Sequence, residues 1–417
     1  MPNSLTVSVI GLGYIGLPTA AMFASRRTRV IGVDVNPLAV DTINAGGIHI
    51  VEPELDMIVR AAVSAGHLRA TLSPEPADAF LIAVPTPFRD DHEPDMRHVR
   101  AAVESIAPVL TKGNVVILES TSPVGATESL IGWLAAARPD LVFPRKTGDV
   151  CDVHVAYCPE RVLPGQVVRE LVINDRIIGG VTPACAERAA SVYSIFVTGE
   201  LLRTDVRTAE MCKLTENAFR DVNIAFANEL SLICDRLGIS VWELIRLANR
   251  HPRVDILQPG CGVGGHCIAV DPWFIVSKTP EEARLIRTAR EVNDDKPRWV
   301  RDKVAAAVDE LAANDRQPRI ACLGLAFKPD IDDLRESPAL GIACALAERF
   351  PGRVMAVEPN IEALPKSLGG RATLVELEEA LEQADVLVLL VDHKPFRKIR
   401  PSLRAGQRLV DTRGIWA

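Results

Sequence analysis

"TVSVIGLGYIGLPTAAMFAS", residues 6–25, is the stretch that decides the fold. A run of apolar and β-branched residues ends at Gly11, and an apolar helical pattern begins directly after Gly16. The glycines have the G-x-G-x-x-G spacing of a tight turn between a strand and a helix. In such a turn Gly11 permits the sharp bend, Gly13 lets a pyrophosphate approach the backbone, and Gly16 lets the helix pack closely on the strand.

An acidic residue supplies the context that the glycines alone lack. Asp34 lies 18 residues after Gly16 (34 minus 16), at the end of the next predicted strand, "RVIGVDVN". A carboxylate there can accept hydrogen bonds from both ribose hydroxyls and would repel a 2′-phosphate, so the sequence predicts NAD rather than NADP. A role for Asp34 as a turn residue before Asn36 would leave this spacing unexplained.

Strand and helix signals alternate in the N-terminal part and again beyond Pro318. Near-continuous apolar strands separated by helices predict a doubly wound parallel sheet. The C-terminal pieces "RIACLGLAFKPD", "RVMAVEPN" and "ADVLVLLVDH" echo "TVSVIGLGYIGLP", "RVIGVDVN" and "ADAFLIAVPT" in the same order. The fold class is therefore α/β, with two Rossmann-like sheets. If the similarity between these pieces is due to chance, the two sheets are unrelated, but both are still expected to form.

The spacing of apolar residues changes in the middle of the chain from alternating strand and helix patterns to a helical one. From about Arg207 to Leu237 apolar residues recur at helical spacing without glycine or proline, which predicts one long helix ended by Gly238. A second helix is predicted in "SVWELIRLANR", and more helix over 281–313, restarting at Pro297. We therefore expect a central all-helical domain at 201–313, between sheet domains at 1–200 and 314–417.

The bulk properties narrow the class of protein. A chain of 417 residues is too long for one core. Its net charge of -7, without a basic run, argues against nucleic-acid binding, although a few converging arginines could still bind an anionic small molecule. No charged leader and no apolar run of about 18 residues stands out. We expect a soluble cytoplasmic protein, and the scattered nine cysteines are expected to be thiols.

The stretch "GCGVGGHCIAVDPW", residues 260–273, carries the chemistry. The glycines before Cys267 let a ligand lie against the main chain and leave amide groups that can hold a thiolate or an oxyanion. Asp271, before Pro272, is predicted to cap the next helix and could also handle a proton near Cys267. A zinc site at Cys261, His266 and Cys267 matches no common spacing, so no metal is expected.

Polar side chains also follow one face of the long helix. Lys213, Asn217 and Arg220 lie at positions i, i+4 and i+7 within "AEMCKLTENAFRDVN". For three polar residues alone a solvated face is the better interpretation, but an asparagine does little on such a face.

Several loops offer hydroxyls and cations at predicted strand ends. "VPTP" with Thr86, and "STSPVGAT" with Thr121 and Thr127, follow strands at the edge where ligands of open α/β sheets lie, although the prolines also fit ordinary turns. Three further loops carry charged residues, namely Glu160 with Arg161, His251 with Arg253, and Lys328 with Arg335. Each could be an ordinary surface loop, but together they offer cations that could bind a diphosphate.

These motifs, in this order and over essentially the whole chain to the closing "DTRGIW", resemble the UDP-glucose/GDP-mannose dehydrogenase family. "GGHCIAVDPWF" and "CPERVLPG" are similar to its branch that oxidises UDP-N-acetyl-D-mannosamine. The resemblance implies a four-electron oxidation at C6 of the sugar, through an aldehyde to a carboxylate, with two NAD molecules in succession. It also implies a homodimer built on the long helix and a place in bacterial surface polysaccharide synthesis.

The resemblance assigns roles to individual residues. Cys267 would form a thiohemiacetal and then a thioester, Lys213 would act as acid or base, and Asn217 and Asp271 would support the oxyanion and the water. The catalytic set would also contain Glu160 and Thr121. The NAD contacts would be Gly11, Gly13, Tyr14, Ile15, Gly16, Asp34, Thr86, Thr127 and Arg335. The substrate contacts would be Arg161, Val162, Lys213, Asn217, Arg220, His251, Arg253, Gly264, Phe327, Lys328 and Arg413. Related proteins carry lysine at the position of Arg413.

Two departures from the family pattern bear on the substrate and the loop. Pro164 stands where UDP-glucose enzymes carry a second glutamate, which disfavours UDP-glucose. Cys261 stands where proline is usual, which should loosen the loop slightly. The alternatives are a dehydrogenase of UDP-glucose, GDP-mannose or UDP-N-acetylglucosamine, or an inactive protein that binds NAD and a nucleotide sugar.

Overall fold

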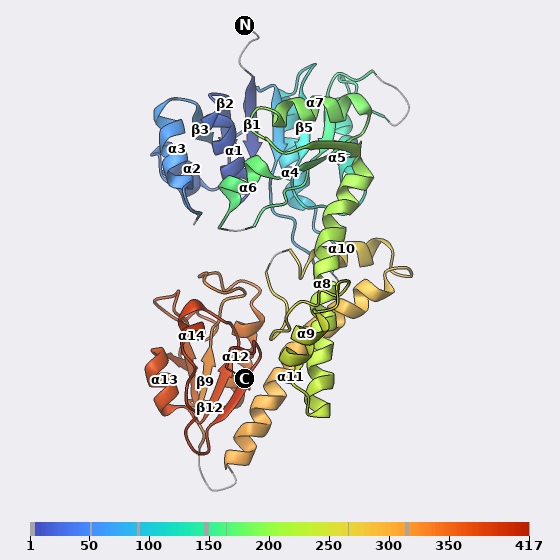
Figure 1. Ribbon diagram of the computed structural model, residues 1–417. Coiled ribbons are helices and arrows are strands. Elements are labelled where there is room, and N and C mark those ends of the chain that lie inside the picture. Colours follow the sequence, from blue (N-terminus) through green and yellow to red (C-terminus); the bar gives the residue numbers. More distant parts are fainter. Residues whose placement is uncertain are drawn as a thin grey trace. The chain divides into compact units, whose positions relative to one another are not determined.

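The computed structural model describes residues 5–50, 52–89, 92–145, 150–163, 165–265, 267–312 and 317–416 (Figure 1). The chain forms two compact units, Met1–Glu216 and Asn217–Ala417, and helix α8 (Val206–Leu237) begins in the first and ends in the second. Among the described residues no helix is long and apolar enough to cross a membrane. The division into three domains stays a prediction.

An eight-stranded sheet forms the centre of the first unit, with the order β3-β2-β1-β4-β5-β6-β7-β8. All neighbouring strands are parallel except β6 and β7. The strands are β1 (Thr6–Ile10), β2 (Arg29–Val33), β3 (Leu68–Thr71), β4 (Ala79–Ile82), β5 (Val115–Leu118), β6 (His154–Tyr157), β7 (Arg176–Gly180) and β8 (Leu201–Asp205). The order reverses between β1 and β4, which is where ligands of doubly wound sheets bind.

Helices cover both faces of this sheet, because its strands are apolar on both sides. One core lies under α1 (Gly16–Ser25), α3 (Leu55–Ser64), α6 (Val167–Ile173) and α7 (Pro183–Tyr193). The other lies under α4 (Arg97–Ile106), α5 (Ala126–Ala137) and the short η1 (Ala107–Val109). The helix α2 (Pro37–Asn44) follows β2. The doubly wound sheet predicted from the sequence is confirmed.

The second unit contains a five-stranded parallel sheet with the order β11-β10-β9-β12-β13. Its strands are β9 (Ile320–Leu323), β10 (Val354–Val357), β11 (Ala372–Leu374), β12 (Val386–Leu389) and β13 (Arg408–Asp411). Its helices are α9 (Val241–Ala248), α10 (Asp271–Lys278), α11 (Arg284–Ala312), α12 (Pro338–Arg349), α13 (Leu377–Gln383) and α14 (Lys394–Arg397). Both α11 and α12 pack on one face of the sheet, and α13 and α14 pack on the other.

The middle helices follow the predicted pattern with one exception. The long helix α8 is present, and Gly238 follows its end at φ +69°, a left-handed value that favours glycine. The helix α11 does not restart at Pro297 but runs through it. Proline removes one amide donor from a helix interior, and here the helix continues because valines beyond Pro297 are held in the core of the second sheet.

The two sheets share more than strand order. Five consecutive strands of the first, β3-β2-β1-β4-β5, match the five of the second in order and direction. Gly11 and Gly324, which directly follow β1 and β9, have φ +90° and +87°. Each donates its amide hydrogen at 2.8 Å to the carbonyl that ends the next strand, Val33 or Val357. Shared turn geometry of this kind supports kinship between the two sheets over a chance echo.

Candidate active site

The glycine turn of the first unit has the shape that a dinucleotide requires. A Cβ atom on Gly16 would lie 1.8 Å from the carbonyl oxygen of Gly11, so only glycine allows α1 to pack there. A Cβ on Gly13 would meet nothing within 4 Å, which leaves its backbone open to a ligand. Ile15 immediately precedes α1, and the Tyr14 side chain is exposed. The turn therefore fits a pyrophosphate at the N-terminal end of α1.

Asp34 lies at the carboxyl end of β2 beside this turn. Its carboxylate accepts hydrogen bonds from the amides of Leu12 and Asn36, both at 2.9 Å. The carboxylate thus ties the glycine turn to the next strand, and its oxygens retain lone pairs for a ribose. Asn36 in turn caps α2 by accepting from the amide of Leu38 at 3.1 Å.

The hydroxyl residues of the strand-end loops are partly engaged with protein groups. Thr86 donates to the carbonyl oxygen of Thr121 at 2.6 Å, which joins the loops after β4 and β5. Thr127 is fully buried, and its amide and hydroxyl both donate to Glu210 on α8, at 2.8 and 2.7 Å. The amide of Gly125 donates to the same carboxylate at 2.7 Å. Glu210, which the sequence analysis missed, holds the N-terminal end of α5, and its burial raises its pKa.

Glu160 belongs to a buried charged network. Its carboxylate accepts from Arg176 at 2.9 Å and from the amide of Arg161 at 2.7 Å. Arg176 also lies 3.9 Å from Glu119, whose carboxylate accepts from the hydroxyl of Tyr193 at 2.6 Å. Burial raises the pKa of Glu119 to about 7, against the opposing effect of Arg176. Three of these groups, Arg176, Glu119 and Tyr193, were missed because they come from distant segments.

The neighbouring loop residues are held by protein contacts. The Arg161 guanidinium is paired with Glu216 on α8, at 2.7 Å between Nη2 and Oε1, and also donates to the carbonyl of Asp175 at 3.2 Å. Val162 packs against the core of the first unit. Pro164, on which the argument against UDP-glucose depended, lies outside the described residues.

The polar stripe on α8 divides into residues of different burial. In the second unit Asn217 is buried and Arg220 is exposed, while Lys213, in the first unit, is half-buried. A second buried cluster lies one turn along, where Arg290 donates to Asp221 at 2.6 Å. The solvated-face interpretation therefore holds for Arg220 and fails for Asn217.

Cys267, Asp271 and Asn217 are brought together in the second unit. The amide of Asp271 donates to the carbonyl oxygen of Cys267 at 2.8 Å, so one turn of backbone separates the two side chains. The Asp271 carboxylate accepts from the side-chain amide of Asn217 at 2.5 Å. The Cys267 residue is exposed, whereas Asp271 and Asn217 are buried. This places the exposed Cys267 one helical turn before a carboxylate that a buried amide holds.

Asp271 is not the cap of α10, as its sequence context predicted. It is the first residue of the helix, Val270 precedes it, and no side chain caps this end. Its carboxylate instead accepts a hydrogen bond from the side-chain amide of Asn217 on α8.

The glycines before Cys267 serve protein packing. A Cβ on Gly264 would lie 2.4 Å from the carbonyl oxygen of Glu336, and one on Gly262 would lie 2.9 Å from Pro338. Gly265, at φ +84°, has the Phe327 ring 3.0 Å from its Cβ position. The bare backbone thus lets this loop lie against residues 327–338. His266 is outside the described residues.

Cys261 has a structural role in the same loop. It is buried in the core shared with the second sheet, where burial raises the pKa of its thiol to about 11. Arg413 fixes the neighbouring backbone, donating to the carbonyl of Pro259 at 3.2 Å and to Asp392 at 2.8 Å. The departure from proline at position 261 therefore places a small apolar group in a core.

The remaining predicted cations of the second unit are exposed. Arg335 donates to Asp333 through two nitrogens, at 2.9 and 2.7 Å, and the Lys328 side chain is exposed. His251 and Arg253 are exposed in the loop after α9, where the amide of Arg253 donates to His251 Nδ1 at 3.3 Å. These side chains are accessible to an anionic ligand.

Comparison with known proteins adds the family. Three sequence models of the UDP-glucose/GDP-mannose dehydrogenase family match the chain. They are the NAD binding domain over residues 5–197, the central domain over 207–295 and the UDP binding domain over 321–417. The glycine turn, α8 and the second sheet lie within these three ranges.

Individual relatives are similar over nearly their whole length. The chain is 68% identical to a UDP-N-acetyl-D-mannosamine dehydrogenase of Yersinia pestis over 99% of both chains. It is 64% identical to an NDP-N-acetyl-D-galactosaminuronic acid dehydrogenase of Ralstonia nicotianae, over 99% of this chain and 96% of that one. A solved UDP-D-ManNAc dehydrogenase structure from Pyrococcus horikoshii superposes with a TM-score of 0.89 at 38% identity, over 99% and 96%. With NAD as its cofactor, the chain is a nucleotide-sugar dehydrogenase that belongs to the UDP-glucose/GDP-mannose dehydrogenase family.

Proposed function

We propose that the chain oxidises UDP-N-acetyl-D-mannosamine at C6 to the corresponding uronate. The observation that carries the proposal is the 68% identity to the Yersinia pestis dehydrogenase of that name, over 99% of both chains. The local geometry agrees, since Cys267, Asp271 and Asn217 form one cluster in the second unit. The uronate would serve surface polysaccharide synthesis in a bacterial cytoplasm.

The residues have separate tasks in this reaction. The glycine turn and Asp34 would hold NAD, which when bound accepts the hydride of each oxidation. Lys213 takes the proton of the C6 hydroxyl as the alcohol becomes an aldehyde. The Cys267 sulfur adds to the aldehyde carbon and gives a thiohemiacetal, whose oxidation leaves a thioester. Water then cleaves the carbon–sulfur bond and releases the carboxylate and the thiol.

Asp271 and Asn217 support the second half of the sequence. The Asn217 side-chain amide holds the Asp271 carboxylate at 2.5 Å, and Asp271 is bonded through its backbone to the carbonyl of Cys267. A carboxylate fixed in this way can accept the proton of the attacking water. We therefore assign Asp271 to thioester hydrolysis and Asn217 to positioning Asp271 and donating to the oxyanion.

The remaining predicted residues keep supporting roles in the proposal. Glu160, held by Arg176, orients the backbone of Arg161, and Thr121 fixes Thr86 at the strand ends. The exposed side chains of Arg220, His251, Arg253 and Lys328 would bind the diphosphate of the sugar nucleotide, and Arg335 would reach NAD.

A panel of nucleotide sugars tests the substrate, with NADH absorbance as the readout. We expect UDP-N-acetyl-D-mannosamine to be oxidised with two NADH per sugar, and Cys267→Ala to form no carboxylate. The first alternative substrate is the sugar of the Ralstonia relative. Identities of 64% and 68% are too similar to decide between the substrates that the two relatives' names indicate. Preferential oxidation of UDP-N-acetylgalactosamine would replace our substrate, and preference for UDP-glucose or GDP-mannose would move the enzyme to another branch.

We further propose that the chain forms a homodimer through α8. Four large apolar side chains of the second unit lie exposed on this helix, at spacings of seven, seven and four residues, which keeps them on one face. They are Phe219, Phe226, Ile233 and Leu237, exposed by 68%, 50%, 46% and 64%. An apolar stripe of this length on a soluble enzyme marks an interaction surface. Light scattering on the purified protein tests it, and a monomer at micromolar concentration would refute it.

A further inference from the structure

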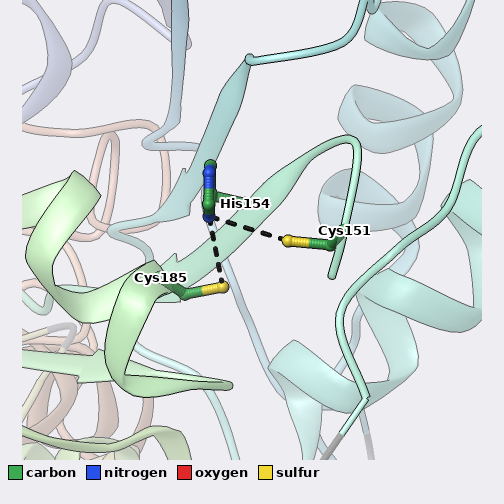
Figure 2. Close-up of side chains that lie close together, drawn as sticks. All are labelled: Cys151, His154 and Cys185. Atoms are coloured by element: carbon green, nitrogen blue, oxygen red, sulfur yellow. Dashed lines mark hydrogen bonds between the residues drawn. The ribbon is translucent and has the colours of Figure 1, made fainter. Parts of the chain in front are cut away.

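Two cysteines and a histidine to which no catalytic role was given above gather in the first unit. Cys151 precedes β6, His154 is the first residue of β6, and Cys185 lies in the first turn of α7 (Figure 2). One ligand atom from each side chain lies within 4.8 Å of the other two. In the part of the chain that the structure describes, this is the one such group of histidine, cysteine or acidic side chains.

The distances match those of a tetrahedral metal site. The sulfur of Cys151 lies 3.7 Å from His154 Nδ1, and the sulfur of Cys185 lies 3.8 Å from the same nitrogen. In a tetrahedral zinc site, with zinc–sulfur near 2.3 Å and zinc–nitrogen near 2.0 Å, sulfur and nitrogen are about 3.5 Å apart. Both pairs are already close to the separation that a shared zinc ion would impose.

A hydrogen bond to the imidazole explains only one of the two sulfur–nitrogen contacts. Nδ1 of a histidine either accepts one hydrogen bond or donates one, so it can hydrogen-bond only one of the two sulfurs at a time. Both sulfurs nevertheless approach this nitrogen, at 3.7 and 3.8 Å, and Figure 2 draws both contacts. A cation placed between the three atoms would satisfy all of them.

The surroundings of Cys185 suit a thiolate ligand. The Thr182 hydroxyl lies 3.3 Å from the Cys185 sulfur and donates to it, while the amide of Cys185 donates to that same hydroxyl oxygen. Hydrogen bonds of this kind orient metal ligands and stabilise their negative charge. The N-terminal end of the eleven-residue helix α7 also attracts negative charge.

We propose that Cys151, His154 and Cys185 bind a zinc ion through two thiolates and Nδ1, with water as the fourth ligand. Cys185 is buried, while Cys151 and His154 are half-buried, which leaves one side of the group open to that water. Burial raises the pKa of the Cys151 thiol to about 11, so zinc must displace its proton on binding. The ion would tie the start of β6 to the start of α7.

The test is a cobalt titration of the full-length protein, stripped of metal by a chelator and kept under a non-thiol reductant. Cobalt in a tetrahedral site with thiolate ligands gives a sulfur-to-metal charge-transfer band and intense visible bands. We expect these bands to saturate at one Co²⁺ per chain and to bleach when Zn²⁺ is added. Cys151→Ser and Cys185→Ser should lose the charge-transfer intensity, and Cys344→Ser, at a half-buried cysteine outside the group, should keep it.

A second measurement separates metal binding from misfolding. Zn²⁺ should raise the thermal unfolding midpoint of the wild type and of Cys344→Ser, and should leave that of Cys185→Ser unchanged, while circular dichroism verifies that each variant folds. Wild-type protein without charge-transfer bands would overturn the proposal. So would Cys151→Ser and Cys185→Ser variants that keep the bands, since cobalt would then be bound by other cysteines.

Discussion

Gly13 and Gly16 belong to one turn, yet an added methyl group should have opposite effects at the two positions. The Cβ of Gly13→Ala would meet no protein atom within 4 Å, whereas that of Gly16→Ala would lie 1.8 Å from the carbonyl oxygen of Gly11. We therefore expect Gly13→Ala to fold normally and to bind NAD weakly, because its methyl group covers the backbone that the pyrophosphate approaches. Gly16→Ala should impair folding itself.

The structure sets the size of each effect. Real Cβ contacts essentially never fall below 3.0 Å, so Gly16→Ala must displace backbone by at least 1.2 Å (3.0 minus 1.8). A backbone clash of this kind should cost more than about 3 kcal/mol of unfolding free energy. Gly13→Ala should change that free energy by less than about 1 kcal/mol. Losing a hydrogen bond to a charged phosphate costs about 1.5–3 kcal/mol, which raises the Kd for NAD about 10- to 150-fold.

Isothermal titration with NAD and denaturant unfolding measure the two quantities. Gly132→Ala is the matched control, because a Cβ at this position within α5 also meets nothing within 4 Å. It should bind NAD as the wild type does and gain up to about 1 kcal/mol in stability. An unchanged Kd for NAD in Gly13→Ala would refute the role of Gly13 in binding the pyrophosphate. Wild-type stability in Gly16→Ala would refute the role of Gly16 in helix packing.

Three further predictions concern other parts of the chain. The folded-state pKa of Glu119, about 7, lies above the ordinary glutamate value of about 4.5, so its ionisation opposes folding and stability is lost as pH rises from 4.5 to 7. Unfolding by urea should show Glu119→Gln gaining about 2.5 kcal/mol relative to the wild type between pH 5 and pH 8, and a constant difference would contradict the buried carboxyl. Glu210→Ala leaves the amides of Gly125 and Thr127 and the Thr127 hydroxyl without their acceptor, which should cost about 3 kcal/mol in the same assay. Phe226→Glu should convert the proposed dimer into a monomer in light scattering, and an unchanged mass would show that this face is not the interface.

The first sheet could be predicted because its signals are local. The apolar strand, the glycine turn and Asp34 lie within 29 residues (34 minus 6, plus one), and each reports the geometry of its own segment. The long helix could be predicted for the same reason, since its apolar positions keep one period throughout. The run through Pro297 could not, because it depends on packing of α11 against a sheet that the chain forms later.

The site residues that could not be predicted have in common that their partners lie far away in the sequence. Glu119, Glu210 and Cys185 find their partners 74, 85 and 31 residues away in the chain, at Tyr193, Gly125 and His154. No spacing rule connects such pairs, because the sheet order and not the sequence distance brings them together. A buried acid within an apolar segment, such as Glu119 at the end of β5, is the signal that could have indicated a network.

The second sheet sharpens the evidence for NAD in the first. Glu358 occupies the position of Asp34, and its carboxylate accepts from the amides of Leu325 and Ala326 at 2.7 and 3.0 Å. An acid at this strand end therefore holds the turn by itself, with or without a dinucleotide. What differs is the turn, where Ala326 and Pro329 replace the second and third glycines. The open backbone at Gly13, rather than the spacing of Asp34, is thus the feature that indicates a dinucleotide in the first unit, and Asp34 then favours NAD over NADP.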